Sequence, residues 1–142
     1  MALYLASVDG DLDALRRLVA GSSPATWDAH AINGAAMGGN VKCLQFALEC
    51  GAPFDPAYAA MLAAQKGHLD ALVFVHAKAG APMAWRPSTL YWAALNNHVG
   101  CARYLLEHMR PLSRRQVADA LAAAKMGACR DCMFLLHDAL HA

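Results

Sequence analysis

Proline recurs along this chain at a constant interval, and this interval restricts the fold more than any other feature of the sequence. Four of the six prolines lie 29 residues apart in series. A turn-forming residue that recurs with a period of roughly 20–50 residues indicates a repeat architecture, in which one small motif packs on the next. The four prolines are Pro24, Pro53, Pro82 and Pro111.

A second marker, glycine or asparagine, lies between the prolines at intervals of 28 to 30 residues. These residues adopt the left-handed backbone conformation easily, as a tight turn after a helix requires. Alanine stands four places before each marker, and apolar residues follow at +2, +5 and +8, which is a helical period. Each unit is therefore predicted to be a helix, a tight turn, a second helix and a proline-bearing loop. The markers are Gly10, Gly39, Gly67, Asn97 and Gly127.

The pattern covers the 142 residues in five units that form a single domain. Hydrophobic residues make up 58% of the chain and charged residues 16%, which supplies apolar helix faces and excludes a disordered chain. The predicted fold class is all-α, a helical-repeat solenoid with Leu44, Leu72 and Leu105 in its core. The approximate repeat boundaries are 1–24, 25–53, 54–82, 83–111 and 112–142.

Segments 38–53 and 66–82 resemble ankyrin repeats. The resemblance lies in the Ala-Ala-x-x-Gly-His-Leu turn and in a second helix that ends at a glycine. The units are about 29 residues long against 33 in ordinary ankyrin repeats, and they lack the Thr-Pro-Leu-His opening. They are similar to the shortened ankyrin-like repeats of protist and giant-virus proteins. The resemblance implies an ankyrin-like solenoid that binds proteins, with short loops and little or no β-hairpin.

Apolar side chains in the loops and at the ends of the first helices mark a predicted partner-binding edge. Interfaces favour Trp, Met and Arg, and ankyrin-like proteins bind along this concave side. A second interpretation stays open, in which the loop aromatic residues only cover gaps between helix pairs. The predicted partner-binding residues are Trp27, Met37, Phe54, Gln65, Lys66, Trp85, Leu95, Asn96, Arg114, Arg115, Lys125 and Met126.

Charge is divided unevenly between the two halves of the chain. Residues 1–70 hold four basic and seven acidic residues, whereas residues 71–142 hold eight basic and four acidic residues. The cluster Arg110, Arg114 and Arg115 is either solvated loop charge or a contact to RNA phosphates or an acidic partner. The main hypothesis is a protein-binding or scaffold module within a multi-subunit complex. The alternative is a structural accessory subunit, such as one of a ribonucleoprotein, whose basic C-terminal half contacts RNA.

One cluster resembles a metal site: Cys129 and Cys132, followed by His137 and His141. Structural zinc sites use these residue types. The repeat register, however, places both cysteines at positions that Leu, Val and Ala occupy in other units, which points them into the core. We therefore predict no bound metal and no cofactor.

Histidine directly follows two of the turn markers, at His68 and His98. We expect these side chains to make a turn-stabilising hydrogen bond. A catalytic histidine needs a nucleophile and an orienting carboxylate in reach. Asp70 lies close to His68 in sequence, but no serine or cysteine is placed to complete such a group. The prediction is that the chain is not an enzyme.

The N-terminal segment contains Asp9, Asp11 and Asp13 where a signal peptide would be apolar. With five cysteines, an odd number, this indicates reduced thiols and an intracellular location, cytoplasmic or organellar. No uncharged apolar run reaches the roughly 18–20 residues that span a bilayer, so no membrane insertion is expected. Segments 1–5 and 133–136 are apolar rather than polar caps. This favours ends covered by a partner, partner-dependent folding or a longer array.

Overall fold

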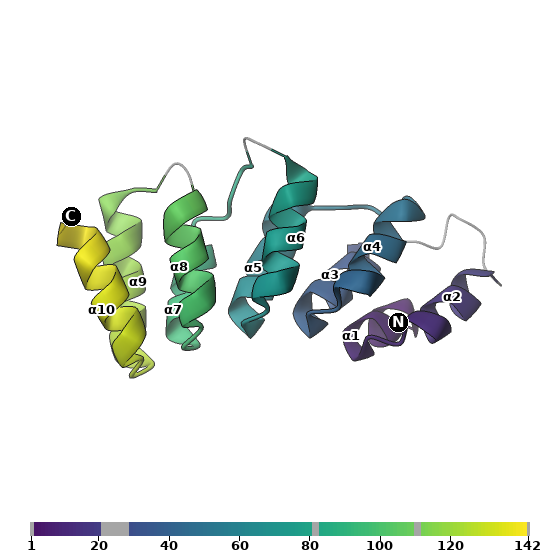
Figure 1. Ribbon diagram of the computed structural model, residues 1–142, viewed down its shortest axis with the longest axis horizontal. Coiled ribbons are helices and arrows are strands. Elements are labelled where there is room, and N and C mark those ends of the chain that lie inside the picture. Colours follow the sequence, from purple (N-terminus) through teal and green to yellow (C-terminus); the bar gives the residue numbers. More distant parts are fainter. Residues whose placement is uncertain (1, 21–28, 81–82, 110–111, 142) are drawn as a thin grey trace.

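The computed structural model describes residues 2–20, 29–80, 83–109 and 112–141, and within these ranges the backbone forms ten helices and no strand (Figure 1). The prediction of an all-α chain with short connections and no β-hairpin is confirmed for this part of the chain. The helices are α1 (Ala2–Asp9), α2 (Leu12–Ala20), α3 (Ala29–Gly38), α4 (Val41–Glu49), α5 (Pro56–Lys66), α6 (Leu69–Ala79), α7 (Thr89–Leu95), α8 (Val99–His108), α9 (Arg114–Met126) and α10 (Arg130–His141).

The helices form five pairs that stack in sequence order into one row (Figure 1). Each odd-numbered helix is the first of its pair, and a tight turn joins it to the even-numbered second helix. First helices pack extensively on the first helices of neighbouring pairs, whereas second helices touch one another much less. The row therefore curves toward the first helices, whose outward side is concave.

Alanine makes the close packing of first helices possible. Ala63 and Ala64 of α5 and Ala93 of α7 are completely buried, because a methyl group lets neighbouring backbones approach. The second helices contribute the larger core side chains. Leu44, Leu72 and Leu105 were predicted to lie in the core, and all three have an exposed fraction of 0%. The helical period read from the sequence thus identifies the buried face of α4, α6 and α8.

The turn markers adopt the backbone geometry that their residue types predict. Gly10, Gly39, Gly67 and Asn97 have φ values of 73°, 70°, 80° and 66°. After each of these residues, the next amide donates to the carbonyl of the alanine five residues before it; the distance from His68 N to Ala63 O is 2.9 Å. This bond satisfies a carbonyl at the end of the first helix and fixes the direction of the second.

The last unit departs from the predicted register by one residue. Gly127 has a φ of −82°, and the left-handed residue is Ala128 with a φ of 56°. A Cβ at Gly127 would collide with the carbonyl oxygen of Leu95 in the preceding repeat, so this glycine is required for space rather than for conformation. As a consequence Leu136, and not Leu135, is the completely buried leucine of α10.

The side chains that follow the left-handed residues connect neighbouring repeats. The side-chain amide Nδ2 of Asn40 donates to the carbonyl oxygens of Ser7 and Val8, at 2.7 and 2.9 Å. His68 and His98 make no side-chain hydrogen bond that caps their own helices. The rings instead lie against the turn glycines of the preceding repeats, Gly39 and Gly67 respectively. The expected hydrogen bond is therefore replaced by a packing contact between repeats.

Helix starts agree with the capping residues in the sequence. Ser113 and Gln116 form a reciprocal capping box at the start of α9, with Gln116 N donating to Ser113 Oγ at 3.1 Å. The α5 helix begins at Pro56, and the carboxylate of Asp55 accepts from Tyr58 N at 3.2 Å. Ser88 precedes α7, but its hydroxyl makes no cap bond. These caps keep the first helices in register along the row.

Candidate functional site

The concave side of the array carries two parallel rows of partly exposed side chains, of which Met37, Tyr91 and Leu95 also pack against the core. The first row lies two residues before each left-handed turn residue, and the second row lies four residues earlier, one helical turn away. We call them the concave rows. Their side chains are half-buried, except at α9, where both are exposed. The first row is Val8, Met37, Gln65, Leu95 and Met126; the second row is Tyr4, Asn33, Met61, Tyr91 and Ala122.

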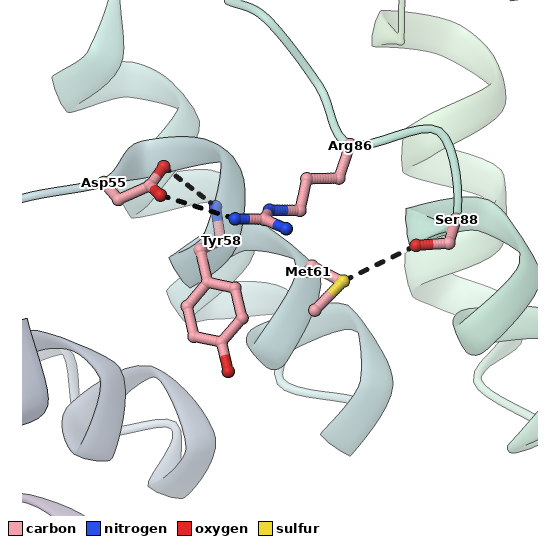
Figure 2. Close-up of polar contacts among 5 residues, drawn as sticks. All are labelled: Asp55, Tyr58, Met61, Arg86 and Ser88. Atoms are coloured by element: carbon pink, nitrogen blue, oxygen red, sulfur yellow. Dashed lines mark hydrogen bonds and ion pairs between the residues drawn. The ribbon is translucent and has the colours of Figure 1, made fainter.

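Contacts between repeats run along this surface. The hydroxyl of Tyr4 donates to the sulfur of Met37 in the next repeat, at 3.5 Å. Ser88 Oγ likewise donates to Met61 Sδ of the preceding repeat, at 3.6 Å (Figure 2). These contacts connect neighbouring repeats at two places along the rows, between α1 and α3 and between α5 and the residue that precedes α7.

An arginine lies across the loop end of this surface. The guanidinium of Arg86 sits over the ring of Tyr58, 4.8 Å from its centroid, and pairs with the carboxylate of Asp55 at 3.6 Å (Figure 2). Both charged side chains are about half exposed, so the ion pair is screened by solvent and contributes little stability. The arrangement leaves a cation, an aromatic ring and a methionine together beside the concave rows.

The fold has a counterpart of known structure. The crystal structure of the human ASB11 ankyrin repeat domain is similar to this chain, with a TM-score of 0.74 and a sequence identity of 22%. The match covers 97% of this chain and 68% of the other chain. The chain has the ankyrin repeat fold. No family model matches its sequence, and no curated protein matches it either.

Four of the predicted partner-binding residues fall on the first concave row of this ankyrin repeat array. They are Met37, Gln65, Leu95 and Met126, and Met126 is the most exposed of the large apolar side chains, at 73%. Lys66 and Asn96, which were also predicted, directly follow Gln65 and Leu95 in the sequence. Asn96 Nδ2 donates to Gln65 O of the preceding repeat at 3.2 Å, so this amide is a joint between repeats as well as a surface group.

The remaining predicted residues lie elsewhere in the ankyrin repeat array. Arg114 and Arg115 are exposed at the start of α9, about 17–18 Å along the helix from Met126 at 1.5 Å per residue. Lys125 is exposed on the outer side of the last repeat. Phe54 is half-buried and packs against the core from the loop. Trp27 lies outside the described residues.

Trp85 packs on the side of the second helices. Its ring lies 4.9 Å from the ring of His76, centroid to centroid. His76 Nδ1 and the hydroxyl of Tyr104 share a hydrogen bond of 2.6 Å, and the rings of Tyr104 and His108 stack at 4.1 Å. Burial and the neighbouring His108 lower the pKa of His76. These contacts agree with the second interpretation, in which Trp85 covers the gap between helix pairs.

The second concave row was not among the residues predicted from the sequence. Tyr4, Met61 and Tyr91 lie four residues before members of the first row, and therefore one turn away on the same helix face. The sequence could have identified them, because the residue four places before each predicted residue lies on the same helix face. Tyr58 was overlooked as well, because its role depends on Arg86 from the next repeat.

The cysteine–histidine cluster of the last repeat is divided between core and surface. Cys129 and Cys132 are buried, whereas His137 and His141 are exposed. Burial, and next the hydrogen bond with Cys129, raise the pKa of the Cys132 thiol to about 12. Cys129 Sγ accepts the amide of Cys132 at 3.3 Å, as an N-cap residue does. Among the described residues no three His, Cys, Asp or Glu side chains are grouped to hold a metal ion.

All five cysteines are free thiols, of which only Cys50 is partly exposed. Burial raises the pKa of the Cys101 thiol to about 11, and burial also raises that of Cys43. Thiols with raised pKa values are poor nucleophiles at neutral pH. The helices within the described ranges are all too short or too polar to cross a bilayer.

Proposed function

We propose that this chain is a protein-binding module whose partner contacts the concave rows. The observation that carries the proposal is that each of the five first helices presents a Tyr, Met or Leu side chain on these rows, half-buried in the first four and exposed at α9. Aromatic residues and methionine are enriched in protein interfaces, and tyrosine is frequent among the residues that contribute most of the binding energy.

The ankyrin repeat fold supports the same proposal. A stacked array presents one concave surface across many repeats, which suits an extended or helical segment of a partner better than a small molecule. The resemblance of the repeat sequence to ankyrin repeats implies protein binding in the same way. Arg86 and Tyr58 at the loop end of the surface would add contacts to a partner that carries a carboxylate or a second aromatic group.

The test compares a concave-row variant with a matched control. The variant Met61→Ala/Tyr91→Ala/Leu95→Ala truncates three neighbouring side chains of the rows. The control Gln45→Ala/Val73→Ala/Arg103→Ala truncates three exposed side chains on second helices. The tagged chain is used to capture partners, and the dissociation constant of each purified partner is then measured by calorimetry for both variants and the wild type.

The expected result is selective loss of binding. Truncating anchor side chains at an interface costs about 2 kcal/mol or more, so the concave-row variant should bind at least about 30-fold more weakly. The control should bind like the wild type, and melting curves should show both variants folded. Equal weakening in the two variants, or full binding by the concave-row variant, contradicts the proposal.

The alternative function is RNA contact by the basic C-terminal half, whose Arg110 lies outside the described residues. Arg114 and Arg115 lie at one end of α9 and Lys125 lies at the other end. Electrostatic RNA binding weakens steeply with salt, whereas binding to the apolar concave rows should change little as the salt concentration rises. A salt titration of the captured complex therefore separates the two functions.

A further inference from the structure

A tight turn just before α7 fixes the positions of two polar side chains. Thr89 N and Thr89 Oγ1 both donate to Arg86 O, at 3.1 and 2.8 Å, and these bonds close the turn from Arg86 to Thr89. Arg86 and Ser88 lie in this turn, and both side chains extend toward α5 of the preceding pair (Figure 2). A guanidinium and a hydroxyl are therefore held together between the third and fourth helix pairs.

The two side chains meet α5 at neighbouring positions. The guanidinium of Arg86 lies 4.8 Å from the ring centroid of Tyr58, and Ser88 Oγ lies 3.6 Å from Met61 Sδ. Residues three apart on a helix are neighbours on its surface, with Cβ atoms about 5–6 Å apart. A phosphate on Ser88 Oγ would therefore lie within reach of the guanidinium.

The hydroxyl of Ser88 is exposed and has a weak partner, since a thioether sulfur is a poor acceptor. It makes no cap bond to α7. The other described hydroxyls of this kind are less accessible: Ser7 and Thr89 are completely buried, and Ser113 Oγ accepts from Gln116 N in the capping box. Among the described serines and threonines, Ser88 is thus the one that an enzyme can modify without opening a cap or uncovering the core.

The guanidinium of Arg86 can accept a stronger anionic partner than the one it has. Its ion pair with Asp55 is 3.6 Å long and half exposed on both sides, so solvent screens it. A guanidinium carries five N–H donors. A phosphate monoester carries nearly two negative charges and forms charge-assisted hydrogen bonds with arginine. Arg86 can therefore bond a phosphate on Ser88 and stay close to Asp55.

We propose that Ser88 is a phosphorylation site and that Arg86 binds the phosphate. A protein kinase transfers the terminal phosphoryl group of a nucleoside triphosphate to Ser88 Oγ. The bond between Oγ and phosphorus forms, the bond from phosphorus to the departing nucleoside diphosphate breaks, and the hydroxyl proton is released. The bonds between the phosphate and Arg86 form within the turn that precedes α7.

The modification would change the loop end of the concave rows. Met61 belongs to these rows and is the present partner of Ser88, so the phosphate brings negative charge to a surface that is otherwise apolar at this point. A regulatory effect on partner binding rests on the proposed function. The phosphorylation site itself does not, and the measurements that test it need no partner.

The first measurement is whether the folded chain is modified at Ser88. The kinase is chosen because it phosphorylates a synthetic peptide of residues 83–92, and it is then incubated with the full chain, magnesium and ATP. Mass spectrometry should find close to one phosphate per chain at Ser88, and Ser88→Ala should lack it. A peptide that is phosphorylated while Ser88 of the folded chain is not overturns the proposal.

The second measurement is the ³¹P NMR titration of the full chain with phosphoserine incorporated at Ser88. The guanidinium lowers the pKa of the second phosphate ionisation, and the nearby Asp55 carboxylate raises it. The proton affinity of the phosphate should therefore rise at least about threefold in Arg86→Gln. It should fall below the wild-type value in Asp55→Asn, in which the asparagine oxygen can still cap α5.

The matched control is Arg103→Gln, which removes one positive charge from an exposed position of α8. Its ³¹P titration should match that of the wild type, and far-UV spectra should show all the variants folded. An Arg86→Gln titration that also matches the wild type overturns the proposal. Equal changes in Arg86→Gln and Arg103→Gln overturn it too, because they would reflect net charge rather than a bond to Arg86.

Discussion

Single positions in the tight turns are set by two different physical requirements. Gly39 and Gly67 have positive φ values, and each packs against the ring of a histidine from the next repeat. Gly127 has an ordinary helical φ and is confined by the Leu95 carbonyl instead. Ala128 adopts the left-handed conformation with a side chain that makes it unfavourable. The last turn therefore combines a required glycine with a strained alanine.

This pair yields opposite predictions for neighbouring residues. Ala128→Gly should raise the free energy of unfolding by about 1 kcal/mol, because glycine enters the left-handed region without strain. Gly127→Ala should lower it by about 1–3 kcal/mol, because the new methyl group overpacks against Leu95 O. Chemical denaturation of both variants measures the two changes. If the turn residue were Gly127, as the glycine spacing predicts, the signs would be reversed.

At the scale of helices, the connection between α6 and α8 contains a titratable group. His76 of α6 shares its hydrogen bond with Tyr104 of α8 and packs against Trp85 from the loop between the pairs. Burial is the larger cause of its lowered pKa, and the proximity of His108 is the smaller one. The second helices touch each other sparsely, so this cluster is a main contact between the third and fourth pairs on the convex side.

The stability of this contact should depend on pH. The pKa of His76 in the folded chain lies below its ordinary value of 6.5, so the unfolded chain takes up the proton first as the pH falls. The free energy of unfolding should therefore decrease as the pH falls below about 6.5, and it should level off below the folded pKa. Melting curves of His76→Gln should lose this component of the pH dependence. His137→Gln, at an exposed histidine, should retain it.

The fold could be predicted from the sequence because its determinants recur with the repeat period. The left-handed glycines and the leucines at 44, 72 and 105 are visible as a spacing. The Gly127 register could not be predicted, since a glycine chosen for space looks the same in sequence as one chosen for conformation. Four of the ten concave-row residues were predicted, because Met37, Gln65, Leu95 and Met126 lie one or two places before a marker. Trp85 packs toward the second helices because it contacts His76. This contact does not recur with the repeat period, so the sequence pattern could not predict it.

For the molecule as a whole, the buried cysteines bear on metal binding. Cys129 and Cys132 are buried core thiols, and Cys129 also caps α10, so folding occupies both groups. We expect purified protein to carry no stoichiometric zinc by elemental analysis. A chelator should leave the melting temperature unchanged. One zinc per chain, or a melting temperature that falls with chelator, would show that α10 rearranges around a metal.

The joints between repeats are built from alanine methyl groups, carbonyl oxygens and the space left by missing side chains, as at Gly38 and Gly127. Some outward positions of the first helices take part in these joints, since Tyr4 donates to Met37 of the next repeat and Met61 accepts from Ser88. A Cβ at Gly34 would likewise meet the side chains of Tyr4 and Val8. In this chain, specialisation of the concave surface is therefore coupled to the way its repeats stack.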